Sequence, residues 1–186
     1  MRFKNNIQMK TKIIIASLFL ALFTSCKNEE KKPVVVEEPK VETFDVAIDL
    51  IIKADDEMIL LYKDGTNQWF DEDHAVWLGV KGSNSVQTAT FNLPEGVIGT
   101  DLRFDIGRND FKGLEPIEIK KITISYKGKR FEINQDKVND YFSTNEFIVY
   151  DPATKQYSFK KNDKGEYDPY FQSKEPLLAE LIKVAQ

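Results

Sequence analysis

The residues with the clearest chemical potential lie in the segment WFDEDHAVW, residues 69–77. It contains the only histidine of the chain, His74, directly after the acids of residues 71–73. A Ser-His-Asp arrangement would have to use His74, and any site that needs two histidines is excluded. The chain contains no Gly-x-Ser-x-Gly and no His-Glu-x-x-His sequence. We therefore expect no enzymatic activity, and an enzyme that uses His74 is kept as an alternative.

The acids beside His74 offer hard oxygen ligands of the kind that calcium prefers. Asp71 and Asp73 are the candidate ligands. The segment lacks the spaced acids and the glycine of a calcium loop, so a solvated loop is the alternative interpretation. Calcium is the one cofactor that the sequence suggests.

Aromatic and amide side chains in the same region suggest sugar binding. Sugars present apolar C–H faces that stack on aromatic rings, and Trp69 lies in a polar stretch beside Asn67. Trp77 lies in an alternating segment, which favours a position in the core. The candidate ligand-binding residues are Trp69, Asn67, Asp71, Trp77, Arg103 and Asp105.

Hydrophobic periodicity predicts the elements that must position these residues. Residues 43–54 (TFDVAIDLIIKA) alternate between apolar and polar side chains, which is typical of a strand with one buried face. Similar short segments recur at even spacing, and leucines at helical spacing follow in residues 174–186. The sequence predicts an all-β antiparallel sandwich with a short C-terminal α-helix. The other expected strands are residues 58–63, 75–80, 85–93, 101–106, 117–119, 121–126 and 130–133, and a hairpin is expected in residues 147–161.

One stretch suggests a family. Residues 93–129 (LPEGVIGTDLRFDIGRNDFKGLEPIEIKKITISYKGK) resemble the second half of jelly-roll, galactose-binding-like domains, in which a Leu-Arg-Phe-Asp strand ends at a glycine and returns as an isoleucine-rich strand. The resemblance implies a non-catalytic, carbohydrate-binding module, and it fixes no sugar-binding residue. From the residues themselves, Leu102 and Phe104 should enter the core. Arg103 and Asp105 should share the outer face, where they can pair.

The N-terminal residues predict the cellular address. A basic opening is followed by IIIASLFLALFT (residues 13–24), which is too short to cross a bilayer and is typical of a secretory signal. Thr24 and Ser25 precede the only cysteine, Cys26, and this resembles the lipobox of bacterial lipoproteins, although Phe23 stands where leucine or valine is usual. Cys26 is the expected lipidation site, and a free thiol in a secreted protein is the alternative.

These features divide the chain into three parts. We expect a signal peptide at residues 1–25, a lipidated and charged linker at residues 26–42, and one sandwich domain at residues 43–186. The lysine and acidic pair that follow the cysteine resemble an export signal for surface lipoproteins. The expected location is the outer membrane, anchored by lipid and displayed at the cell surface, with the periplasmic leaflet as the alternative.

Charge excludes one class of partner. The formal net charge is −4, and removal of residues 1–25, which hold four basic residues and no acid, lowers it to −8. Nucleic acid is therefore not expected as a partner, because its binding depends on basic side chains. The expected function is carbohydrate binding beside the membrane. The alternative is a structural or protein-interaction lipoprotein whose sheet edge or C-terminal helix docks a membrane-complex partner.

Overall fold

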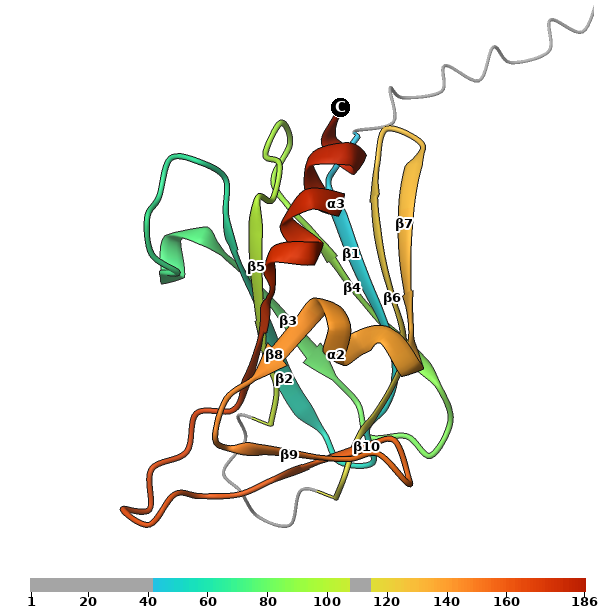
Figure 1. The fold of residues 1–186 in the computed structure, drawn as a ribbon, viewed down its shortest axis with the longest axis vertical. Helices are drawn as coiled ribbons and strands as arrows, with labels where there is room; N and C mark the ends of the chain where they lie inside the picture. The colour runs from blue at the N-terminus through green and yellow to red at the C-terminus, as the bar shows by residue number, and fades with distance from the viewer. Residues whose placement is uncertain (1–41, 108–114) are drawn as a thin grey trace, which may run out of the picture. The chain divides into compact units, whose positions relative to one another are not determined.

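Alternating apolar side chains build two antiparallel sheets that pack face to face in the computed structural model (Figure 1). The structure describes residues 42–107 and 115–186. The predicted signal peptide, Cys26 and the linker up to residue 41 lie outside the described residues. Within them, the predicted all-β antiparallel sandwich with a C-terminal helix is confirmed.

The first sheet has four strands in the order β4-β1-β6-β7. In β1, Val46, Ile48 and Leu50 are buried while Asp45 and its alternate neighbours face outward, as period two requires. The neighbouring strands repeat this alternation, so the sheet has one apolar and one polar face. The strands are β1 (Asp45–Ile51), β4 (Gln87–Asn92), β6 (Glu118–Tyr126) and β7 (Lys129–Asn134).

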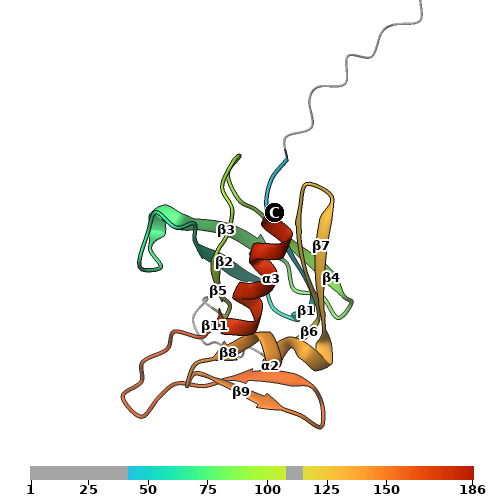
Figure 2. The same ribbon diagram turned by 45° about the horizontal axis from the view of Figure 1, so that its top comes forward.

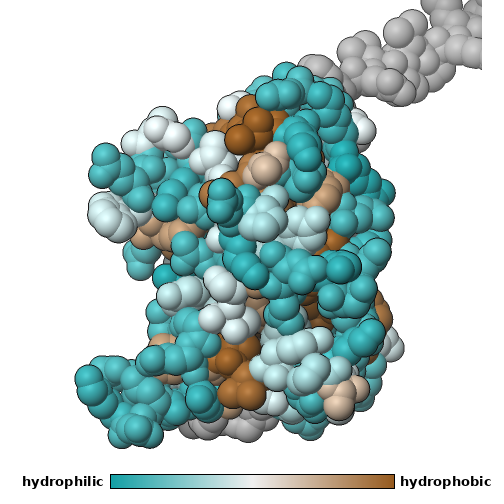
Figure 3. Space-filling view, viewed as in Figure 1, coloured by the Kyte–Doolittle hydropathy of each residue, from teal (hydrophilic) through white to brown (hydrophobic). Residues whose placement is uncertain are grey.

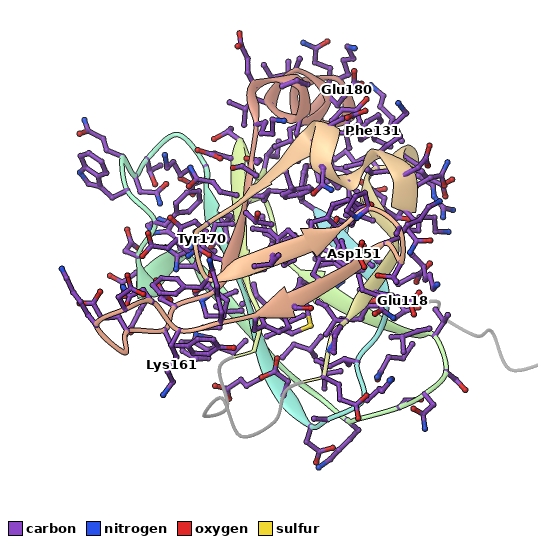
Figure 4. The ribbon with its side chains drawn as sticks, turned by 60° about the horizontal axis from the view of Figure 1, so that its bottom comes forward. Glu118, Phe131, Asp151, Lys161, Tyr170 and Glu180 are labelled. Carbon is purple, nitrogen blue, oxygen red and sulfur yellow. The ribbon has the colours of Figure 1, made fainter. Side chains whose placement is uncertain are left out.

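The second sheet has five strands in the order β3-β2-β5-β11-β8. Its inner face includes Leu60 and Phe104, which are opposite one another on adjacent strands. A separate two-stranded hairpin, β9 with β10, crosses one end of the sandwich, and Figure 4 looks onto it. The strands are β2 (Asp56–Lys63), β3 (Ala75–Val80), β5 (Asp101–Asp105), β8 (Phe142–Thr144), β9 (Ile148–Asp151), β10 (Gln156–Phe159) and β11 (Tyr170–Ser173).

The chain crosses repeatedly between the two sheets. β1, β4, β6 and β7 belong to the first sheet, whereas β2, β3, β5, β8 and β11 belong to the second. Chain crossings between the two sheets therefore bring segments far apart in the sequence onto one face.

Aromatic rings fill the space between the sheets. The Phe104 ring is stacked on Phe171, with ring centroids 4.5 Å apart, and meets the Phe142 ring edge-on at 5.3 Å. All three side chains are at most 1% exposed. Because Phe171 and Phe142 come from the last third of the chain, this cluster fixes the C-terminal strands to the centre of the second sheet.

The helices are short, apart from one at the C-terminus. α3 (Glu175–Ala185) lies over the opening between the two sheets and buries Leu177, Leu181 and Val184 (Figures 1 and 2). Lys174 occupies the N-cap of α3, and the Ser173 hydroxyl donates to Asp101. The other helical segments are the 3₁₀ turns η1 (Glu72–His74) and η2 (Gln135–Lys137) and the single turn α2 (Val138–Tyr141). Within the described ranges, no helix has the length and hydropathy of a membrane span.

Candidate ligand-binding face

The outer face of the five-stranded sheet brings together three of the predicted site residues. Ile59 of β2 is opposite Trp77 on one side and Asp105 on the other, and Asp105 is opposite Tyr170 of β11. These residues form one row across four strands. With adjacent strands about 4.8 Å apart, the Trp77 and Tyr170 backbones are about 14 Å apart. Arg103 lies on the same face, one pleat along β5.

Arg103 is held at the centre of this face. Its Nε donates to Asp105 Oδ1 at 2.7 Å, and its Nη2 donates to Asp105 Oδ2 at 2.9 Å. The same Nη2 donates to Asp168 Oδ2 at 3.3 Å. The guanidinium carbon lies 3.8 Å from the centroid of the Tyr170 ring. Burial alone would lower the pKa of Arg103, but the hydrogen bond and charge of Asp105, together with Asp168, raise it overall. The predicted pairing of Arg103 with Asp105 is present in this geometry.

The loop between β2 and β3 is braced by Asn67. Its Nδ2 donates to the carbonyl oxygens of Tyr62 at 3.1 Å and Trp69 at 2.9 Å, and its Oδ1 accepts from the Asp64 N–H at 3.2 Å. Asp64 in turn accepts from the N–H and the hydroxyl of Thr66. The Asn67 amide therefore has a structural role in holding the backbone that carries Trp69.

Asp71 and His74 contact one another at the end of this loop that leads into β3. Asp71 is the N-cap of η1, and its Oδ1 accepts from the His74 N–H at 3.1 Å and lies 2.7 Å from His74 Nδ1. The hydrogen bond between the two side chains lowers the pKa of Asp71 and raises that of His74. The His74 ring also meets the Tyr62 ring edge-on, with centroids 5.6 Å apart.

The structure places Asp73 in η1, beside this pair. The described part of the chain contains no group of three or more His, Cys, Asp or Glu side chains that could hold a metal ion. Binding of calcium by Asp71 and Asp73 stays a prediction, and one oxygen of Asp71 already accepts from His74.

Both tryptophans are on the surface. Trp69 is 78% exposed and Trp77 is 45% exposed. The core position that the alternation favoured for Trp77 is wrong, because Val76 and Leu78 take the inward positions of β3 and Val80 is buried beyond them. Next to Trp69, the Phe70 ring receives the Lys63 ammonium at 4.7 Å from its centroid. Two indoles are therefore exposed, one on the sheet and one on its adjoining loop.

Sequence reasoning missed the contribution of the C-terminal segment to this face. Phe171 of β11 is fully buried between the sheets. Tyr170 points to the other side of the sheet, toward Arg103, and Gln172 is opposite Arg103 in the register. The alternation of residues 170–173 was the available signal, but it does not tell which strand β11 pairs with.

A second concave surface lies on the outer face of the four-stranded sheet and was also missed. It is a groove of about 670 Å³ lined by β1, β4, β6, β7 and the turn between the last two. Asp45, Ala47 and Asp49 form its middle strand. Their alternation was visible in the sequence, whereas the curvature of the sheet around them was not.

No family model matches the chain, and no similar protein was found among curated proteins or solved structures.

Proposed function

We propose that this protein is a lipid-anchored outer-membrane lipoprotein whose non-catalytic sandwich binds carbohydrate through Trp69 of the β2–β3 loop and the outer face of the five-stranded sheet that carries Trp77, together called the tryptophan face. The observation that carries the proposal is the exposure of Trp69, at 78%, on a loop whose backbone is fixed by Asn67 and Asp71. An exposed indole on a braced loop loses little conformational freedom when a ligand stacks on it.

The chemistry of the face suits a sugar. Indole rings stack on the apolar C–H faces of a pyranose, and neighbouring polar groups bond its hydroxyls. Gln172 and Asp168 lie on the far side of the face from the tryptophans and supply an amide and a carboxylate. The acids of the β2–β3 loop, Asp64, Glu72 and Asp73, give this end negative charge, which disfavours acidic ligands. A neutral glycan is the ligand that fits.

The N-terminal residues give the proposal its location. Acylation of Cys26 would tether the domain through the linker of residues 26–42 and hold bound glycan close to the membrane, near a transporter or an enzyme. More than one acyl chain is needed for stable anchoring, which the lipoprotein modification provides. Display at the cell surface is the first choice, and the periplasmic leaflet is the alternative.

The alternative of a protein-interaction lipoprotein has less support. A docking helix would need a free apolar side, but α3 buries Leu177, Leu181 and Val184 in the sandwich and leaves Ile182, at 56%, as its exposed large apolar side chain. The face seen in Figure 3 is mostly hydrophilic, with small separate apolar areas in place of one broad patch. Large exposed apolar patches are what mark protein interfaces.

A glycan array tests the proposal. The full chain, purified in detergent, is applied with and without calcium, beside Trp69→Ala and the matched control Ile182→Ala, which also removes an exposed apolar side chain. We expect retention of neutral glycans by the wild type and by Ile182→Ala, and loss of retention with Trp69→Ala at an unchanged melting temperature. Absence of retention on the whole array, or equal retention by all three proteins, would contradict the proposal. Retention that needs calcium would identify Asp71 and Asp73 as ligands.

A further inference from the structure

The groove on the outer face of the four-stranded sheet differs in character from the tryptophan face. Its floor consists of short side chains, with Ala47 between Asp45 and Asp49 on β1 and Thr123 opposite Ala47 on β6. Ser125 continues this row of hydroxyls along β6. A floor of short side chains leaves the volume of about 670 Å³ open, which is enough for several sugar rings.

Both acids of β1 that line the groove accept hydrogen bonds from neighbouring side chains. Asp45 Oδ1 accepts from the Thr43 hydroxyl at 2.5 Å and from Asn92 Nδ2 at 2.7 Å. Asp49 Oδ1 accepts from the Thr88 hydroxyl at 2.7 Å, and its other oxygen lies 3.5 Å from Lys121 Nζ. Lys121 offsets part of the negative charge of Asp49, whereas the two donors to Asp45 are neutral groups that fix the orientation of its carboxylate.

The basic side chains at one end of the groove form few ion pairs. Lys127 and Gly128 form the turn between β6 and β7, Lys129 and Arg130 begin β7, and all four line the groove. Arg130 pairs with Glu132 at 2.5 Å, but in the part of the chain that the structure describes neither Lys127 nor Lys129 forms an ion pair. Two exposed ammonium groups therefore border a hydroxyl-rich groove on a protein whose net charge is negative.

Lys127 occupies a position that glycine or asparagine usually fills. Its φ is +48° and that of Gly128 is +78°, the pair of positive values that a tight two-residue hairpin turn of type I′ requires. A lysine in this conformation is strained relative to asparagine. The Lys127 ammonium lies 5.1 Å from the centroid of the Tyr126 ring at this end of the groove, and a role in binding gives a reason for a lysine in this conformation.

We propose that this groove binds a linear acidic glycan, a hydroxyl-rich chain whose carboxylates meet Lys127 and Lys129 while its hydroxyls bond the floor. A bilayer is flat and would touch the turn without filling the groove. Nucleic acid carries a denser charge that the carboxylates of Glu42, Asp45 and Asp49 oppose, and it would find no exposed ring to stack on, because Tyr126 is buried. The site is separate from the tryptophan face and does not depend on it.

Binding of uronate oligosaccharides by the full chain in detergent tests this site. The probes are oligogalacturonate and oligomannuronate at low salt, with methyl-esterified oligogalacturonate as the neutral control. Lys127→Asn removes the ammonium while suiting the turn, and Lys155→Asn is its matched control, because Lys155 has a φ of +57° in the turn between β9 and β10. Ala47→Phe fills the floor with a residue that suits a strand.

The expected results separate this site from every other explanation. The wild type should bind at least one uronate probe and not the ester, and the Kd should rise about two- to fivefold in Lys127→Asn. Ala47→Phe, shown by circular dichroism to be folded, should not bind, whereas Lys155→Asn and Trp69→Ala should bind as the wild type does. No binding by the wild type, or equal weakening by the two lysine variants, would overturn the proposal. Uronate binding that survives in Ala47→Phe would also overturn the proposal. The same holds if the wild type binds a single-stranded oligonucleotide or anionic vesicles more tightly than it binds the uronate probes.

Discussion

Substitution of Phe104 by alanine should remove a large part of the stability of the sandwich. Its side chain is 1% exposed, stacked on Phe171 at 4.5 Å and edge-on to Phe142 at 5.3 Å. Truncation of a buried phenylalanine costs about 3–5 kcal/mol. The two aromatic partners, each contributing about 0.5–1.5 kcal/mol beyond buried area, place this residue toward the upper end. We expect a loss of about 4–5 kcal/mol, which lowers the melting temperature by about 12–15 °C in a domain of this size.

Urea unfolding followed by far-ultraviolet circular dichroism measures this loss. Tryptophan emission is a poor probe here, because Trp69 and Trp77 are exposed in the folded state. Val149→Ala is the control, since Val149 is 47% exposed on β9 and its truncation should cost less than about 0.5 kcal/mol. A loss below about 1.5 kcal/mol for Phe104→Ala, or equal losses for the two variants, would refute the view that this aromatic cluster ties the C-terminal strands to the second sheet.

Four further predictions follow from the described contacts and from the predicted lipidation of Cys26. Because His74 has a raised pKa in the fold, the stability from its pair with Asp71 should be complete below its ordinary pKa of 6.5 and be lost as pH rises through the folded value. Nuclear magnetic resonance of the single histidine should show a lower pKa in Asp71→Asn than in the wild type, because the hydrogen bond to Asp71 is the largest cause of the rise. The lowered pKa of Asp71 acts in the opposite direction, with stability present above its ordinary value of 3.8 and lost as pH falls through the folded value. Iodide should quench the emission of both tryptophans in the native protein, and protection of Trp69 would contradict its exposure of 78%. Lys127→Asn and Lys155→Asn should each stabilise the fold by about 0.5–1 kcal/mol in thermal unfolding, because asparagine tolerates positive φ better than lysine. Cys26→Ala should release the protein from membranes on fractionation, and persistent membrane association of the unacylated chain would contradict lipidation.

The strands could be predicted from the sequence because period two leaves a strong local pattern. The alternation of Val46, Ile48 and Leu50 predicted β1, and Leu102 with Phe104 predicted β5. The pairing of strands could not be predicted, because β1 and β5 alternate alike and still belong to different sheets. Sheet membership depends on how the whole chain crosses between layers, which no local pattern records.

The candidate site could be predicted only where residues close together on one strand determine it. Arg103 and Asp105 are two residues apart, so their common face and their pairing follow from local geometry. Trp77 was assigned to the core because apolar side chains in a strand usually point inward, and only the burial of Val76 and Leu78 shows that the inward positions were taken. The role of Asp71 as the N-cap of η1 was missed, although the Asp-x-x-His spacing was visible. The proximity of Tyr170 to Arg103 depends on the pairing of β11 with β5 and lies beyond local sequence.

The emission of Trp69 tests the central claim most directly. In the full chain carrying Trp77→Phe, Trp69 is the only tryptophan, so its emission reports on one ring. The protein is titrated with a panel of neutral oligosaccharides. If the tryptophan face binds carbohydrate, at least one oligosaccharide will shift the emission to shorter wavelength and protect it from iodide in a saturable way, since stacking removes the indole from water. Emission that does not change with any oligosaccharide would contradict the claim. So would unchanged emission with an oligosaccharide that the same protein is shown to bind.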